Sequence, residues 1–321
     1  MNMEDQAPTR RVYVEVCLRA GSVASCSDVR ARALAYLQQR HGIFTTGPVA
    51  FGDSEYLQQH VTRIEIAEIE DDSDLGNGGN EREEDSLSPN EVDSANVAVP
   101  PWEAELVVQV FQLNDEPPVE ETAEDDENVT TCQQLLLPAS SLHGLWDSLI
   151  YDSHVKRTVL DYATTAMLFS DACVNPHIIS WNRVVLLHGP PGTGKTSLCK
   201  ALAHKLSIRL SDRYPTAHLV EINAHSLFSK WFSESGKLVM KLFRQIQELV
   251  DDAESLLDSL KNFPNVLVLT TSNITEAIDV AFVDRADIKQ CTKKVTVNEF
   301  IQQLSKAAQV EKDHKKMIAS G

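Results

Sequence analysis

The chain has no long apolar run and no cysteines at metal-binding spacing. No stretch approaches the length of a membrane-spanning helix, and no apolar segment at the N-terminus resembles a signal peptide. The six cysteines form no C-x-x-C pair and have no histidines at matching spacing, so we expect neither a zinc site nor a disulfide framework. These absences favour a soluble protein of a reducing compartment, with no membrane partner.

Basic residues are almost missing from residues 65–127. This stretch holds 22 acidic residues and one base, Arg82, whereas the rest of the chain carries 28 bases and 25 acids, for a net charge of −18 overall. Phosphate contacts need clustered Lys and Arg, so nucleic acid is not expected as a direct partner. We interpret the acidic stretch as a solvated linker rather than a dedicated binding tail.

A glycine loop follows an apolar run at residues 184–188. It fits the pattern G-x-x-x-x-G-K-[ST] in full, and the residues after it, 197–203, contain no helix breaker. The order is therefore strand, glycine loop, helix, which is typical of nucleotide-binding α/β proteins. The candidate nucleotide-binding residues are Gly189, Pro190, Pro191, Gly192, Thr193, Gly194, Lys195, Thr196 and Ser197.

The residue types in this loop suit a polyphosphate. Glycines let backbone N–H groups wrap around the phosphates, and the following helix directs its positive end at them. Lys195 can neutralise charge on the β- and γ-phosphates, and the Thr196 hydroxyl can bind Mg²⁺. Glycine-rich turns between a strand and a helix also occur without a ligand, and this alternative stays open.

The first part of the chain predicts a small α+β domain. Val12, Val14 and Val16 alternate with polar residues as in a strand, 28–37 has the pattern of an amphipathic helix, and 61–69 and 105–113 are strand-like. We assign residues 1–114 to this domain, with an acidic disordered insertion at about 71–95, and residues 115–141 to an acidic linker. Because no catalytic constellation is present in it, we expect the domain to recognise a substrate or adaptor.

Four segments of the second part resemble the pachytene checkpoint protein 2 family of AAA+ ATPases, called thyroid receptor-interacting protein 13 in animals. These segments are 147–153, 187–197, 227–237 and 270–275. The resemblance implies an α/β fold, a P-loop AAA+ module over residues 142–290 with a parallel sheet flanked by helices. It also implies a homo-hexamer that uses ATP and Mg²⁺ to remodel HORMA-domain proteins presented by an adaptor. The processes implied are the meiotic recombination checkpoint, chromosome synapsis and the spindle checkpoint, in the nucleus and cytoplasm.

The resemblance also implies roles for individual residues. Lys195 acts with Asn273, the polar sensor 1 residue that orients the attacking water, and with Arg285, which reaches into a neighbouring subunit's site. Trp231 and Phe232 line the pore and hold the substrate chain. Each role has an alternative: Asn273 caps a following helix, Arg285 forms a surface ion pair, and the two aromatic residues are a core pair.

Two parts of the family pattern are missing. A strand ending in Asp-Glu is needed to bind Mg²⁺ and polarise water. The one acidic pair in the interval between 222 and 266 is Asp251-Asp252, and it follows a helical pattern rather than a strand pattern. That strand would lie between 219–222 and 266–269, so either the sheet pairs across the gap or the region folds poorly. The second missing part is most of the helical lid with its sensor 2 arginine, of which residues 291–321 retain a remnant. The alternative function is therefore a catalytically inactive nucleotide-binding isoform, or an incomplete gene model, that only binds partners.

Overall fold

The computed structural model describes residues 10–40, 42–71, 98–123, 126–151, 153–172, 183–222, 265–273 and 288–292. The chain divides into two compact units. The first consists of Met1–Asp115 and Ser207–Ala217, and the second of Glu116–Leu206 and His218–Gly321. Among the described helices, none is both long enough and apolar enough to cross a membrane.

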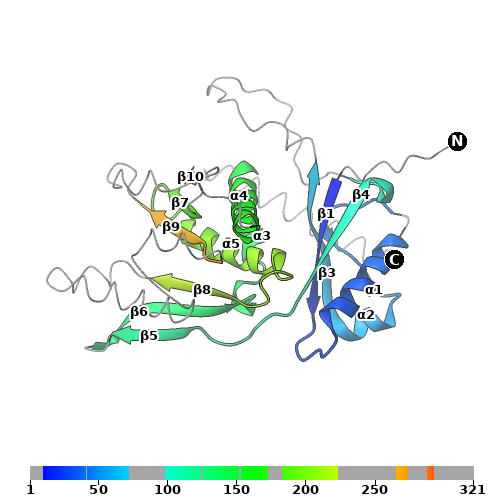
Figure 1. The fold of residues 1–321 in the computed structure, drawn as a ribbon, viewed down its shortest axis with the longest axis horizontal. Coiled ribbons are helices and arrows are strands. Elements are labelled where there is room, and N and C mark those ends of the chain that lie inside the picture. The colour runs from blue at the N-terminus through cyan, green and yellow to red at the C-terminus, as the bar shows by residue number, and fades with distance from the viewer. Residues whose placement is uncertain are drawn as a thin grey trace, which may run out of the picture. The chain divides into compact units, whose positions relative to one another are not determined.

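The first unit is a four-stranded sheet with helices on one face (Figure 1). Strand β1 lies between β3, its antiparallel partner, and β4, its parallel partner, and β2 pairs with the other edge of β3. The elements are β1 (Arg10–Leu18), α1 (Cys26–Gln38), β2 (Gly47–Pro48), α2 (Glu55–His60), β3 (Val61–Asp71), the 3₁₀ helix η3 (Pro101–Glu103) and β4 (Ala104–Phe111). The predicted α+β organisation is confirmed.

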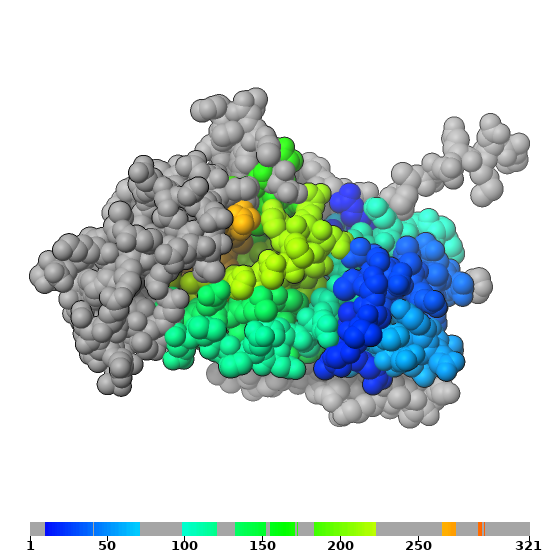
Figure 2. All heavy atoms as spheres, turned by 60° about the horizontal axis from the view of Figure 1, so that its bottom comes forward, coloured from blue at the N-terminus to red at the C-terminus, as the bar shows by residue number. Residues whose placement is uncertain are grey.

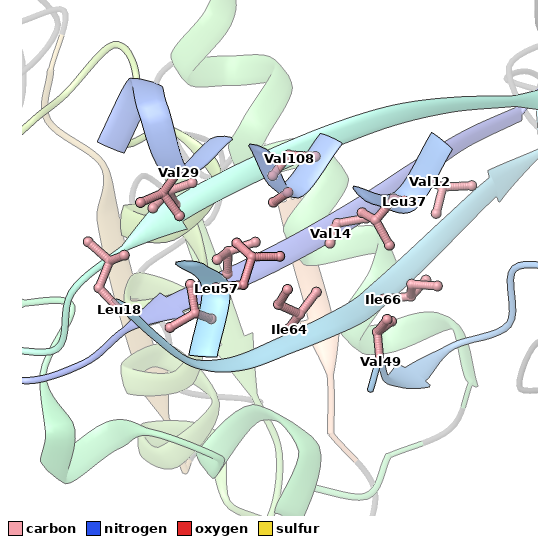
Figure 3. Packing of buried hydrophobic residues seen from close by; sticks show 14 of the residues in the cluster. Val12, Val14, Leu18, Val29, Leu37, Val49, Leu57, Ile64, Ile66 and Val108 are labelled. Carbon is pink, nitrogen blue, oxygen red and sulfur yellow. The ribbon is translucent and has the colours of Figure 1, made fainter. Parts of the chain in front are cut away.

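Periodic apolar residues build the core of this unit. Val12 and Val14 of β1 alternate with more exposed neighbours and are fully buried, as a strand with one face on a core requires. Val29, Ala33 and Leu37 recur every four residues along α1 and are also fully buried. Figure 3 shows Val12, Val14, Val29 and Leu37 gathered between the strands and the helices.

The second unit contains two three-stranded sheets. One is parallel, in the order β10-β7-β9, and the other has the order β5-β6-β8. Its elements are β5 (Val119–Ala123), β6 (Asp126–Leu137), the 3₁₀ helix η4 (Ser140–Leu142), α3 (Leu145–Ser148), α4 (Ser153–Asp171), β7 (Val184–His188), α5 (Lys195–Arg209), β8 (Ala217–Ile222), β9 (Val268–Ser272) and β10 (Ile288–Cys291). The last three residues of α5 and the first residue of β8 are counted with the first unit.

Strand β7 is the centre of the parallel sheet. Val184 to Leu187 are all buried, which explains why this strand is a continuous apolar run rather than an alternating one. Helix α5 follows the glycine loop and buries Leu198, Ala201 and Leu202 at helical spacing. The predicted order of strand, glycine loop and helix is confirmed.

The stretch 115–141 is not an irregular linker in its described part. It forms the antiparallel pair β5 and β6, whose register brings Glu120 opposite Gln133, with Gln133 Nε2 donating to Glu120 Oε1 at 2.8 Å. Figures 1 and 2 show this pair beside β8. A strand at the edge of a sheet tolerates charged side chains, so an acidic composition does not exclude a strand. The composition of this stretch therefore suggested a linker, although the structure has a hairpin there.

Strands β8 and β9 belong to different sheets in the part of the chain that the structure describes. Strand β9 pairs with β7, and β8 lies next to β6. The described strands therefore do not pair across the position where the family places the Asp-Glu strand. Asp251 and Asp252, most of the predicted insertion at 71–95 and residues 293–321 of the predicted lid remnant lie outside the described residues.

Candidate functional site

The glycine loop leaves the carboxyl end of β7, the central strand of the parallel sheet. Parallel α/β sheets bind ligands at this end, where loops connect strands to helices. Three glycines of the loop have positive φ angles: 141° at Gly189, 77° at Gly192 and 78° at Gly194. Residues with a Cβ rarely adopt these angles, so the backbone of the loop explains why glycine occupies all three positions.

Two of the glycines are also in close contact with residues from outside the loop. A Cβ on Gly189 would lie 2.3 Å from the carbonyl oxygen of Thr292, and a Cβ on Gly194 would lie 2.6 Å from the hydroxyl oxygen of Tyr151. Both distances are far below van der Waals contact. Gly192 has no such neighbour within 4 Å and is exposed, so the loop is open on that side.

Lys195 is the first residue of α5 and is only 5% exposed. Its ammonium group donates to the carbonyl oxygens of Gly189 and Pro190, at 2.9 and 2.7 Å, and lies 3.3 Å from Thr193 Oγ1. The charge is therefore held by backbone oxygens of the loop itself. An ammonium group in this position is suited to contact a phosphate bound in the loop.

Prolines restrict where the loop can offer backbone donors. The carbonyls of Gly189 and Pro190 each precede a proline, Pro190 or Pro191, and a proline has no N–H group. The donors that could bind phosphate must therefore come from the second half of the loop and the first turn of α5. That half contains Gly192, Thr193 and Gly194.

Thr193 has the largest number of contacts in this second half. Its hydroxyl donates to Pro190 O at 3.0 Å and lies 2.8 Å from the hydroxyl of Thr292. Its carbonyl oxygen accepts a hydrogen bond from the Tyr151 hydroxyl at 3.0 Å. Burial raises the pKa of Tyr151 to about 12, so this hydroxyl remains a donor at neutral pH.

These residues fit a nucleotide with Mg²⁺. The loop has three glycines with positive φ angles, and a buried ammonium group is held by its carbonyl oxygens. Thr196, the predicted Mg²⁺ ligand, is exposed at the start of α5, and Ser197 beside it is half-buried. Helix α5 is long enough for its N-terminal N–H groups to favour an anion.

Asn273 lies at the same edge of the sheet as the glycine loop. It is exposed and directly follows β9, whose last residue, Ser272, is in register with His188. The Ser272 carbonyl accepts a hydrogen bond from the backbone N–H of Gly189 at 3.2 Å. The structure thus places Asn273 next to the start of the loop, and its sensor 1 role stays a prediction. Arg285, Trp231 and Phe232 lie outside the described residues.

Sequence reasoning assigned no role to Tyr151 or Thr292. Tyr151 is 42 residues before its partner Thr193, and Thr292 is 99 residues after it. Neither residue belongs to the loop pattern, and short-range periodicity carries no information on such contacts. For Tyr151 the signal available was its position in one of the four segments that resemble the AAA+ family.

Comparison with known proteins identifies both parts of the chain. The family of the TRIP13 N-terminal domain matches residues 7–116, and the AAA family, ATPases associated with various cellular activities, matches residues 185–294. The chain is 43% identical to the pachytene checkpoint protein 2 homolog of Gallus gallus, over 87% of this chain and 69% of that protein. It is also 43% identical to the Homo sapiens homolog, over 89% of this chain and 70% of that protein.

A solved structure agrees with these relatives. The structure of C. elegans PCH-2 is similar with a TM-score of 0.63 and 30% sequence identity, covering 89% of this chain and 73% of that one. The similarity thus extends over the N-terminal α+β domain and the AAA domain with its glycine loop. The chain belongs to the pachytene checkpoint protein 2 family of AAA ATPases.

Proposed function

We propose that this chain binds ATP and Mg²⁺ in the glycine loop and uses them to remodel HORMA-domain proteins. The observation that carries the nucleotide site is the buried ammonium group of Lys195, held by Gly189 O and Pro190 O of the glycine loop. In this site the N–H groups of the second half of the loop hold the phosphates. Lys195 neutralises the β- and γ-phosphates, and Thr196 binds Mg²⁺.

Remodelling rests on membership of the family. The N-terminal unit recognises the substrate or an adaptor, and the AAA domains assemble into a homo-hexamer. Trp231 and Phe232 hold the substrate chain in the central pore, and Arg285 reaches the nucleotide of the neighbouring subunit. The expected setting is the meiotic recombination checkpoint, chromosome synapsis and the spindle checkpoint, with the protein in the nucleus and cytoplasm.

Hydrolysis needs a group that orients the attacking water. Bound ATP supplies a γ-phosphoryl group as the electrophile, and Asn273, at the end of β9, is the proposed residue for positioning the water. A carboxylate beside it is also required. No Asp-Glu pair follows an apolar run between β8 and β9 in the sequence, so the sequence pattern assigns no residue to this role.

This observation favours a second candidate function. A chain that binds nucleotide without hydrolysing it would act as a regulatory partner of complete subunits. In the described part of the chain, β8 and β9 belong to separate sheets. A strand carrying the Asp-Glu pair would lie beside β9, so this separation is consistent with the regulatory function.

One experiment separates these functions. Binding of labelled ATP with Mg²⁺ and the release of inorganic phosphate are measured on the full chain and on Lys195→Ala, which serves as the blank. Turnover above the blank supports the remodelling ATPase, and closed HORMA protein with its adaptor should then be converted to the open form. Binding without turnover supports the regulatory function. No binding by the wild-type chain would exclude both functions.

A further inference from the structure

We propose that Thr292 and Tyr151 are positioning residues for nucleotide binding, which hold Thr193 from two sides and fix the phosphate-binding half of the glycine loop. This inference rests on the proposed function, since it concerns the same site. It adds two residues that lie outside the loop pattern and that have no role in the sequence-based assignment.

The contact with Tyr151 sets the direction of a backbone donor. Its hydroxyl donates to the carbonyl oxygen of Thr193 at 3.0 Å. That carbonyl shares one planar trans peptide group with the N–H of Gly194, and in such a group the two bonds point to opposite sides. Holding the carbonyl toward Tyr151 therefore turns the Gly194 N–H, one of the donors that could bind phosphate, away from Tyr151.

Tyr151 is itself held in place. Lys156 of α4 donates to the carbonyl oxygens of Trp146 and Leu149, at the end of α3 just before Tyr151, and the Leu149 bond measures 3.0 Å. The Lys156 ammonium also lies 4.9 Å from the centre of the Trp146 ring, a cation–π distance. Burial lowers the pKa of Lys156, so these carbonyls compensate for a charge that is partly removed from water.

The contact with Thr292 sets the side chain of Thr193. The Thr193 and Thr292 hydroxyl oxygens lie 2.8 Å apart, and either hydroxyl could donate to the other. Each hydroxyl also lies within hydrogen-bond distance of a backbone carbonyl, Pro190 O at 3.0 Å for Thr193 and His188 O at 3.2 Å for Thr292. The position of the Thr193 side chain thus depends on a residue that follows β10.

Thr292 is fixed firmly enough to serve as this support. It is fully buried, and its backbone N–H donates to His188 O at 2.8 Å, which continues the pairing of β10 with β7. Its carbonyl oxygen packs against Gly189. A change at Thr292 is therefore transmitted to both ends of the loop, at Gly189 and at Thr193.

The test uses binding of fluorescent ADP with Mg²⁺ to the full chain. Thr292→Val removes the hydroxyl and keeps the side-chain shape, and Tyr151→Phe removes the phenolic donor. Loss of one hydrogen bond between neutral groups weakens binding by about five-fold, and we expect each variant to raise the Kd for ADP by about that factor. Thr292→Ser, which retains the hydroxyl, should bind within about two-fold of the wild type.

Thr270→Val is the matched control. It removes a hydroxyl that donates to Val185 O at 3.1 Å in the same sheet, away from the loop. A general loss of stability would weaken binding in Thr270→Val and Thr292→Val alike, whereas positioning affects only the latter. If either Thr292→Val or Tyr151→Phe binds within two-fold of the wild type, the proposal is overturned. If the wild-type chain fails to bind, or Lys195→Ala binds equally well, the proposed nucleotide site itself is wrong.

Discussion

The hydroxyl oxygens of Thr193 and Thr292 lie 2.8 Å apart, although 99 positions separate the two residues in the chain. Both the side chain and the carbonyl of Thr193 have partners from outside the loop. The loop is consequently shaped by its surroundings as well as by its glycines. This relationship makes the nucleotide site sensitive to residues far from it in sequence.

The glycines of the loop should differ in their tolerance of alanine. In Gly192→Ala the new methyl group meets no atom within 4 Å, so the cost is the positive φ alone, about 1–2 kcal/mol. In Gly189→Ala it would overlap the carbonyl of Thr292, a backbone atom that has little freedom to move. We expect thermal unfolding without nucleotide to occur at a clearly lower temperature for Gly189→Ala than for Gly192→Ala. Equal midpoints would show that Thr292 does not constrain the loop.

The sequence predicted the parts of the fold that depend on local patterns. The alternation at Val12, Val14 and Val16, the apolar run of β7 and the glycine pattern all correspond to observed elements. Composition was less informative, because the acidic stretch at 115–141 contains the hairpin of β5 and β6. The contacts of Thr193 were not predictable, since they depend on how distant segments meet around the sheet.

Arg209 should contribute strongly to the stability of the first unit. Its guanidinium group lies 3.0 Å from Glu68 and 3.4 Å from Glu70, with its carbon 3.9 Å from the centre of the Tyr13 ring, and its side chain is 6% exposed. Arg209→Met leaves two partly buried carboxylates without this cation. We expect a loss of about 2 kcal/mol, below the range for fully buried pairs because both glutamates keep some exposure. Urea unfolding of the full chain measures it.

Arg11 provides the control for this prediction. It pairs with Glu105 at 3.4 Å, but both side chains are 52% exposed. Exposed ion pairs contribute little, so Arg11→Met should change the free energy of unfolding by less than about 0.5 kcal/mol. Similar losses in Arg209→Met and Arg11→Met would mean that burial of Arg209 does not strengthen its ion pairs.

His204 should make the chain less stable in mild acid. Burial, with the neighbouring His143 and Lys205, lowers the pKa of His204 from 6.5 to about 4. Between these values the unfolded chain binds a proton and the folded chain does not, so stability is full above pH 6.5 and falls as the pH decreases toward 4. We expect a loss of about 2 kcal/mol between pH 7 and pH 5 from this residue.

The variant His204→Gln isolates this effect. It does not titrate, so its free energy of unfolding should fall less than that of the wild type between pH 7 and pH 5, whatever its stability at neutral pH. Chemical denaturation at both pH values measures the difference. Equal losses in the two proteins would show that His204 titrates alike in the folded and unfolded chains.

Equilibrium binding of ATP with Mg²⁺ to the full chain shows whether the glycine loop binds a nucleotide through Lys195. We predict saturable binding by the wild type and at least ten-fold weaker binding by Lys195→Ala, because the ammonium group held at Gly189 O and Pro190 O is the charge that faces the phosphates. No binding by the wild type, or equal binding by both proteins, would show that the loop does not bind nucleotide through Lys195.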